Sequence, residues 1–291
     1  MRVSLFRLYF QGPLKELPRA PTLLGHLLWW YRYTHGRKAL EGLLESFHQD
    51  PPFRLSSVYP EGWLPRPKLP PVQVEETALR KTLKNLRLIT LETFAMVAER
   101  GEEALLQAPE VRGEKAPPEP RRLRRSRVGI DRATGAARKG ILFTQELLFP
   151  DPQTAYALYV MGEAPFDLRD ALAFVGEMGF GGGASVGLGR FRVEGPFALE
   201  LPEAQGANAY ATLAPGPLEG ALYYELEPYW GRLGGGYVGA KPFKRPHFRT
   251  REGSVYREAK ALLLDTTPEE PPEAGARTWE FLGVFPLGVR V

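Results

Sequence analysis

Cysteine is absent from this sequence of 291 residues. Its absence excludes disulfide frameworks, thiolate zinc sites and cysteine nucleophiles, and it favours a reducing compartment. Long apolar runs are absent as well: the sequence contains no uncharged run of about 18 apolar residues. The N-terminal MRVSLFRLYFQG carries charges within its apolar stretch. We therefore expect a cytoplasmic protein with no membrane anchor.

The composition is otherwise that of an ordinary globular protein. Hydrophobic residues make up 43% and charged residues 25% of the chain, which argues against disorder and low complexity. A single core seldom grows beyond about 250 to 300 residues. The length therefore favours two domains, which we expect at residues 1–150 and 151–291.

Basic residues are concentrated in two windows of an otherwise acidic chain. Residues 112–139 hold ten basic and three acidic residues, a net charge of +7. Residues 232–260 hold eight basic and two acidic residues, a net charge of +6. Because the whole chain carries only +4, the remainder has a net charge of −9. This segregation indicates a polyanion or another acidic partner, with nucleic acid as the first candidate.

The first half of the chain predicts a strand, helices and a long hairpin. Residues 3–10 are rich in branched and aromatic side chains, as strands are. Apolar residues at helical spacing then predict a helix that Gly36 ends, and a second short helix after it. Seven prolines exclude a helix over residues 50–72. Turn-forming residues between two β-favouring runs predict a hairpin over residues 121–149.

The second half repeats this order of elements. Residues 155–162 read as a strand, and Asp167 begins a helix as its N-cap. A glycine-rich segment and several strands follow, the last of them an edge strand. Strand, helix and strands in both halves predict an α+β fold of two ferredoxin-like (RRM-like) domains, with a protruding β-hairpin and a glycine-rich loop.

Six glycines lie among the eleven residues 179–189, GFGGGASVGLG. A P-loop is excluded because no GxxxxGK[ST] is present. A dinucleotide-binding turn is disfavoured because the run follows a helix and precedes a strand, the reverse of the usual order. Two interpretations stay open: backbone contact with phosphates, or a helix end with a flexible turn.

The passage GFGGGASVGLGRFRV resembles the glycine-rich loop of the RAMP superfamily of CRISPR-associated proteins. Further passages resemble the RAMP subunits that bind the 5′ handle of the guide RNA in type III-A CRISPR effector complexes: SSVYPEGWLPRPKLP, KTLKNLRLITLETF, RSRVGIDRATGAARKGILFTQELLF, YYELEPYWGRLGG, EGSVY and FLGVFPLGV. The resemblance extends over most of the chain.

This resemblance implies a non-catalytic subunit without cofactor or metal. Its partners would be the crRNA 5′ handle, the large signature subunit and the backbone RAMP subunit. The hairpin would act as a thumb that kinks the guide, through Arg127, Arg132 and Lys139. The loop residues implied to meet the handle are Gly181, Gly182, Gly183, Ser185, Gly187, Gly189 and Arg190. For Lys241, Lys244 and Arg245 no motif is matched, and a solvated face is expected.

Two other functions remain open. A repeat-processing endoribonuclease of the same superfamily would use a histidine as general acid or base. The four histidines, His26, His35, His48 and His247, form no HxH or HExxH pair, and the carboxylates form no metal-ligand pattern. A protein scaffold would instead bind its partners through the proline-rich residues 50–72, with little affinity for RNA.

Overall fold

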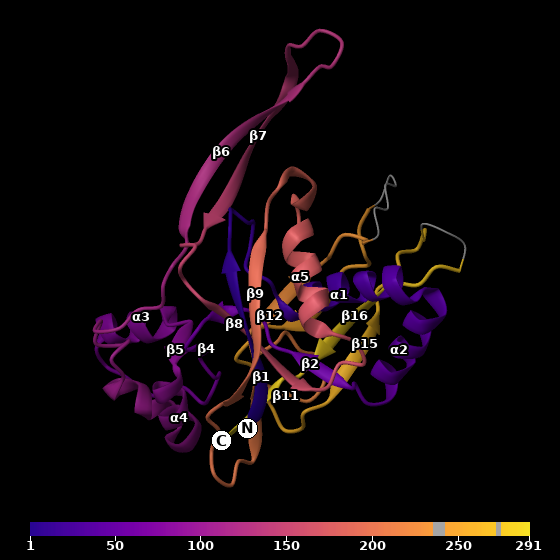
Figure 1. The fold of residues 1–291 in the computed structure, drawn as a ribbon. Helices are drawn as coiled ribbons and strands as arrows, with labels where there is room; N and C mark the ends of the chain where they lie inside the picture. The colour runs from indigo at the N-terminus through magenta and orange to yellow at the C-terminus, as the bar shows by residue number, and fades with distance from the viewer. Residues whose placement is uncertain (235–241, 272–274) are drawn as a thin grey trace.

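The centre of the fold is an antiparallel sheet built from strands of both halves of the chain. In the computed structural model, which describes residues 1–234, 242–271 and 275–291, the strand order is β2-β8-β1-β9, and β3 also pairs with β8. The bounds are Arg2–Phe10 (β1), Phe53–Leu55 (β2), Tyr59–Pro60 (β3), Tyr156–Gly162 (β8) and Phe191–Glu200 (β9). Figure 1 shows this sheet in the body of the protein.

Two helices complete a ferredoxin-like unit around this sheet. Helix α1 (Ala20–His35) connects β1 to β2, α5 (Leu168–Met178) connects β8 to β9, and the two helices contact each other. The Asp167 side chain accepts the N–H of Asp170 at 3.0 Å, which confirms the expected N-cap. A Cβ on Gly176 would collide with the carbonyl oxygen of Phe191. Glycine therefore lets α5 lie directly on β9.

The position of β8 and β9 corrects the expected domain boundary. Both strands pair with β1, in registers that include Phe6↔Leu158 and Tyr9↔Arg192. Residues on both sides of position 150 therefore belong to one sheet, and a boundary between residues 1–150 and 151–291 is wrong for this unit. The order of elements along the chain could not reveal this, because it does not specify which strands pair.

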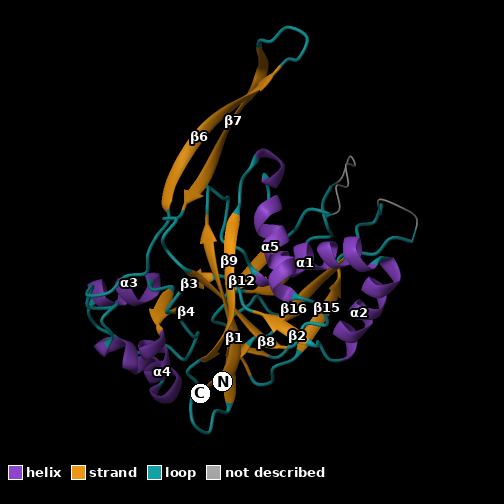
Figure 2. Ribbon diagram, in the orientation of Figure 1, coloured by secondary structure: helices purple, strands orange, loops and turns teal. Residues whose placement is uncertain are grey.

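The segment between β3 and β8 is an insertion that carries the hairpin. Its first part, at the lower left of Figure 2, contains β4 (Trp63–Pro65), α3 (Thr77–Asn85), β5 (Leu88–Thr90), α4 (Leu91–Arg100) and the 3₁₀ helix η1 (Glu102–Gln107). Its second part consists of β6 (Arg121–Ile130) and β7 (Ala137–Phe149), which extend away from the body. Helix α2 (Arg37–Gln49) follows α1 before the sheet continues.

The residues after β9 contain strands but no α-helix, within the ranges that the structure describes. One sheet has the order β11-β14-β10-β17, with β17 at its edge, and two pairs, β12-β13 and β15-β16, lie beside it. The second ferredoxin-like unit that the sequence predicts is therefore not formed here. The bounds are Ala209–Thr212 (β10), Ala221–Tyr223 (β11), Leu226–Tyr229 (β12), His247–Thr250 (β13), Val255–Tyr256 (β14), Ala261–Asp265 (β15), Trp279–Gly283 (β16) and Pro286–Val289 (β17).

A continuous hydrophobic core joins these C-terminal strands to the ferredoxin-like unit. The Phe47 and Phe281 rings meet edge to face at 4.9 Å between centres, and the Tyr59 hydroxyl donates to the carbonyl of Leu213 at 2.6 Å. The two parts therefore pack as one body. Among the described residues no helix has the length and apolar character that crossing a membrane requires.

Candidate nucleic-acid interface

Strands β6 and β7 form the hairpin predicted over residues 121–149. Their pairing runs from Arg121↔Phe149 to Val128↔Leu142, with an irregularity before Ile130. Residues paired across an antiparallel ladder have their side chains on the same face, and successive residues alternate between faces. The register therefore assigns each side chain of the hairpin to one of two faces.

The front face of the hairpin carries arginines without acidic partners. We define it by Arg121, Arg125, Arg127, Phe143 and Phe149. Arg127 lies opposite Phe143, and the Arg125 guanidinium lies 6.0 Å from the centre of the Phe149 ring. Within the described part of the chain, no carboxylate forms an ion pair with these three arginines. Cations interleaved with aromatic rings are the arrangement with which proteins hold single-stranded nucleic acid.

The back face of the hairpin differs in chemistry. Arg122 and Arg124 both lie 3.4 Å from the carboxylate of Glu146, so their charge is partly neutralised. Farther out, Val128 and Leu142 form an aliphatic pair, and Leu142 is 74% exposed. The positive charge of the first basic window is therefore concentrated on the front face and at the tip.

Asp131 closes the tip of the hairpin. Its carboxylate accepts the N–H groups of Ala133 at 2.9 Å and Thr134 at 3.2 Å, as aspartates do in Asx turns. Arg132 and Lys139 are exposed beside this turn. Of the three hairpin residues singled out from the sequence, Arg127 is thus on the front face and the other two lie near the tip.

Three of the six glycines in residues 179–189 are required by packing within the loop. A Cβ on Gly179 would collide with the carbonyl of Leu188, one on Gly189 with the carbonyl of Phe180, and one on Gly183 with the Leu188 side chain at 2.7 Å. Gly179 also ends α5 with φ of 90°. The structural interpretation of the glycine run therefore holds for these three positions, and the positive φ of Gly181 (74°) and Gly187 (83°) extends it to their backbone conformation.

The other three glycines face open space. No atom lies within 4 Å of a Cβ built on Gly181 or Gly187, and a Cβ on Gly182 would meet only Lys15, whose Nζ would be 3.1 Å away. The backbone N–H groups of Gly182, Gly183 and Ser185 have no hydrogen-bond acceptor in the described structure. Unpaired N–H groups beside a lysine are suited to bind an anion such as a phosphate.

His26 of α1 contacts the glycine-rich loop. Its Nε2 accepts the N–H of Gly181 at 3.3 Å, and its ring lies 5.1 Å from the Phe180 ring. Burial lowers the pKa of His26, which favours the neutral form that can accept this bond. Neither Lys15 nor His26 was assigned to the interface from the sequence, because no local motif links either residue to a loop more than 150 positions away.

The segment after β1 joins the loop to the base of the hairpin. Leu14 exchanges backbone hydrogen bonds with Leu148 of β7 at 2.8 and 3.0 Å, and the carbonyl of Pro13 accepts the N–H of Gly189 at 2.8 Å. Arg190, exposed immediately before β9, has no ion pair or side-chain hydrogen bond to the described residues. The loop, Lys15 and the hairpin base thus form one continuous region.

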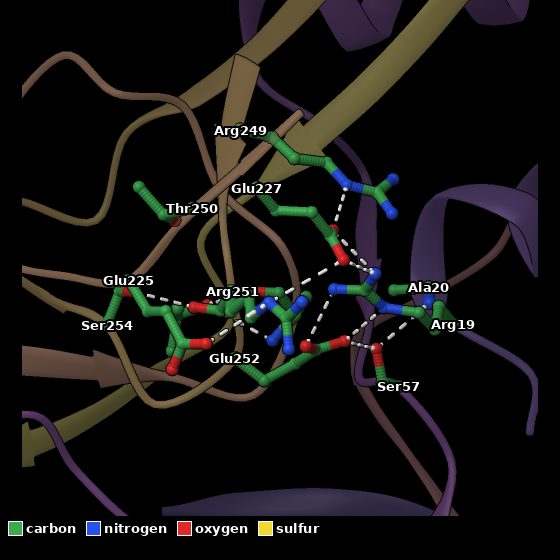
Figure 3. Close-up of polar contacts among 12 residues, drawn as sticks. Arg19, Ala20, Ser57, Glu225, Glu227, Arg249, Thr250, Arg251, Glu252 and Ser254 are labelled. Atoms are coloured by element: carbon green, nitrogen blue, oxygen red, sulfur yellow. Dashed lines mark hydrogen bonds and ion pairs between the residues drawn. The ribbon is translucent and has the colours of Figure 1, made fainter. Parts of the chain in front are cut away.

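One cation of the second basic window, Arg249, is buried in an ion-pair network, whereas Arg232, Arg245, Arg251, Arg257 and Lys260 are exposed. Arg249 is 1% exposed, donates to Glu227 at 2.8 Å and to Glu280 at 2.7 Å, and lies 3.5 Å from the centre of the Tyr229 ring. Glu227 also accepts from Arg19, at 2.6 Å (Figure 3). These charges therefore connect the C-terminal strands to the start of α1.

The solvated face expected for Lys241, Lys244 and Arg245 is wrong for Lys244. Its Nζ donates to the carbonyl of Trp279 at 2.7 Å and lies 3.9 Å from Glu280. Arg245 is exposed and donates to the carbonyl of Asp265 at 2.7 Å. Lys241 lies outside the described residues. A count of charges could not separate these cases, because the acidic partners lie elsewhere in the sequence.

The four histidines lie at separate places. His35 stacks on Tyr31 with ring centres 4.3 Å apart, and His48 meets the Trp279 ring edge to face at 4.8 Å. His247 lies 3.5 Å from Glu280. In the described ranges, no three His, Asp or Glu residues are grouped as a metal site would need.

The fold and the loop define a ferredoxin-like α+β protein with a surface suited to nucleic acid. The model of the RAMP superfamily matches residues 19–192, which is more than half of the chain. The chain therefore belongs to the RAMP superfamily, as the resemblance of its glycine-rich passage predicts. The matched region runs from the start of α1 to the start of β9 and so includes the loop and the hairpin.

Individual relatives are also similar to this chain. "CRISPR system Cms protein Csm4" of Thermococcus onnurineus (strain NA1) is 29% identical over 220 residues, 70% of this chain and 71% of that protein. A chain from the crystal structure of a Csm1–Csm4 cassette in complex with pppApA has a TM-score of 0.61 and 18% identity, over 100% of this chain and 99% of its own. A chain from a Csm3–Csm4 subcomplex of the type III-A CRISPR-Cas interference complex has a TM-score of 0.55 and 15% identity, over 99% and 97%. The two structures share the fold of this chain.

Proposed function

We propose that this protein is a non-catalytic, RNA-binding subunit of a type III-A CRISPR interference complex. It caps the 5′ handle of the crRNA and bridges the large signature subunit to the backbone RAMP subunits, in antiviral defence. The observation that carries this proposal is the loop with unpaired N–H groups at Gly182, Gly183 and Ser185, beside Lys15 and continuous with the base of a cationic hairpin. We assign it to the cytoplasm, the reducing compartment that the absence of cysteine favours.

The loop would bind the handle through its phosphates. Gly181, Gly182 and Gly187 leave the backbone accessible, so a nucleotide chain can approach the main chain. The three N–H groups then donate to phosphate oxygens, and Lys15 and Arg190 supply positive charge. Gly189 contributes only by its packing, since it is buried against Phe180.

The hairpin would act as the thumb. Its front face holds the strand through Arg125 and Arg127, with Phe143 available for stacking. At the tip, Arg132 and Lys139 extend the positive surface away from the body. A kink of the guide near the handle boundary follows if a base is held against the front face while the handle stays on the loop.

The relatives support the proposed partners. The chain resembles, over nearly its whole length, chains of structures that contain Csm1 with Csm4 and Csm3 with Csm4. We propose that this chain likewise assembles with a large subunit and with a backbone RAMP subunit.

The endoribonuclease alternative is less well supported. His26 is the histidine next to the loop, but its Nε2 is occupied by the Gly181 N–H. Comparing His26→Ala and His247→Ala with the wild type tests this alternative: wild-type cleavage of repeat RNA that either substitution abolishes would contradict a non-catalytic role. The scaffold alternative predicts weak RNA binding with almost no dependence on salt, whereas phosphate contacts predict a steep dependence.

The decisive experiment is purification of the complex with its native partners, followed by sequencing of the bound RNA. A uniform 5′ end with a variable interior supports the proposal, and random RNA contradicts it. Gly182→Asp sharpens the test, because its carboxylate would lie beside Lys15, where a phosphate is expected. We expect this variant to lose RNA, whereas Gly42→Asp, which adds the same charge at an exposed position of α2, retains it.

A further inference from the structure

We propose a second RNA-binding surface, here named the α1 platform, formed by Trp29, Arg32, Tyr33, Arg232 and Phe243. It binds unpaired nucleobases of the same RNA strand whose phosphates the glycine-rich loop holds. The inference rests on the proposed function, and it assigns a role to the exposed part of the second basic window.

The first part of the platform is on α1. The Arg32 guanidinium lies 4.7 Å from the centre of the Trp29 ring, and the Tyr33 ring lies 5.7 Å from Trp29 at an angle of 34°. Tyr33 is 66% exposed, although a buried position would stabilise an aromatic side chain more. An exposed ring beside a guanidinium plane offers a stacking surface to a base.

The second part comes from the second basic window and lies next to the first. Arg232 is exposed, with its guanidinium 5.7 Å from the centre of the Phe243 ring, and Phe243 is 44% exposed. Gly234, two residues after Arg232, packs so closely against Trp29 that a Cβ would collide with the indole Nε1. The two arginine–aromatic pairs are therefore neighbours, although about 200 residues separate them in the sequence.

The platform is continuous with the glycine-rich loop. His26, Trp29 and Tyr33 follow one another at spacings of three and four residues along α1, which places them along one side of the helix. His26 contacts the loop at Gly181, and Trp29 lies one turn farther along. A strand whose phosphates are bound by the loop can therefore place its next bases over Trp29 and Tyr33.

Charge favours RNA over a protein as the occupant. Residues 28–40 and 228–251 contain no acidic residue. Elsewhere the chain has arginine–aromatic pairs that are neutralised: Arg7 lies 4.8 Å from the Phe197 ring and donates to Glu61 at 2.8 Å. Within the described structure Arg32 and Arg232 have no such carboxylate. Their positive charge is therefore available to a polyanion.

The test uses the assembled complex, reconstituted with guide RNA that carries photoreactive 4-thiouridine. In the wild type we expect crosslinks to peptides of the platform and to the loop. Two variants are compared: Tyr33→Ala alone, and Arg32→Ala combined with Arg232→Ala. Each should reduce the platform crosslinks about fivefold or more, the loss expected for one unstacked base. The matched control Phe197→Ala removes a 41% exposed ring of the neutralised pair and should leave the crosslinks unchanged.

The outcomes separate this inference from the proposed function. Crosslinks to the loop or hairpin with none to the platform would overturn the inference alone, while Gly182→Asp would still release RNA. A complex without RNA would overturn both. A third outcome is that the wild type gives no crosslinks at the platform and the platform variants lose a protein subunit from the complex. This outcome would show that the surface docks a protein and would also overturn the inference.

Discussion

Arg19 and Glu252 meet in a two-point contact that joins the ferredoxin-like unit to the C-terminal strands. The Arg19 Nε and Nη2 atoms each donate to one carboxylate oxygen at 2.8 Å. The Ser57 hydroxyl donates to the same carboxylate at 2.7 Å. Burial alone would raise the pKa of Glu252, but Arg19 and Ser57 hold it below its ordinary value. With Glu252 ionised, this contact therefore stabilises the packing of the ferredoxin-like unit against the C-terminal strands.

Arg19→Met is expected to destabilise the protein strongly. It would leave Glu252 and Glu227 buried without their shared cation, and breaking a buried pair in this way costs about 3–5 kcal/mol. Arg2→Met is the control, because Arg2 is 92% exposed in its pair with Glu200 and such surface pairs contribute about 0–1 kcal/mol. Urea unfolding measures both. Equal losses in the two variants would show that the network does not stabilise the fold.

The same network predicts loss of stability in acid. Despite burial, which opposes ionisation, neighbouring cations lower the pKa values of Glu227, Glu252 and Glu280 in the folded state. Unfolded glutamates titrate near about 4.3, so the unfolded chain takes up protons first as the pH falls. The stabilisation is complete above that pH and is lost as the pH falls through the lower folded pKa values. In thermal unfolding measured between pH 7 and about 3, the melting temperature should decrease once the pH is below about 5. The decrease should be less steep in a Glu252→Gln variant that still folds.

Local patterns in the sequence predict individual elements well. Gly36 ends α1 with φ of 87°, Asp167 caps α5, and the turn residues around Asp131 form the hairpin. Each depends on neighbours within a few positions, whose chemistry the sequence shows directly. The pairing of β1 with β8 and β9 could not be predicted in this way, since the choice of sheet depends on which surfaces bury together.

The candidate site shows the same limit. The glycine run identified the loop, but the structure was needed to separate the packed Gly179 and Gly189 from the open Gly181 and Gly187. Charge clustering identified the hairpin correctly as cationic, yet the same argument applied to the second window counted the buried Arg249 as available charge. Net charge does not report where partners lie, so it predicts a surface only when acidic residues are far away in space.

The two faces of the hairpin provide a matched comparison. Arg125→Glu with Arg127→Glu reverses charge on the front face, where no carboxylate compensates, and we expect strong loss of RNA from the complex. The salt dependence of binding should also become shallower, by about 0.7 in logarithmic slope for each lost phosphate contact. Arg122→Glu with Arg124→Glu makes the same change on the back face beside Glu146 and should have a smaller effect. Equal effects measured by filter binding would contradict the assignment of the RNA to the front face.

His26 is expected to position the loop rather than to react with RNA. His26→Ala removes the acceptor for the Gly181 N–H, so hydrogen exchange of the loop amides should accelerate and RNA binding should weaken about five- to tenfold, the cost of about one hydrogen bond. His26→Asn keeps a carbonyl acceptor and should restore part of the binding. His48→Ala, which removes a ring packed on Trp279, is the control.

The pH dependence distinguishes this role from a purely structural one. Protonation would turn the Nε2 of His26 into a donor and break its contact with Gly181. Because burial lowers the pKa of His26 below its ordinary value, about 6.5 for a free histidine, the contact should persist at pH 7 and be lost only in mildly acidic solution. The wild type should then lose RNA at acidic pH with faster loop exchange, and His26→Asn should lack this added loss. Identical pH profiles of the wild type and His26→Asn would rule out positioning by His26.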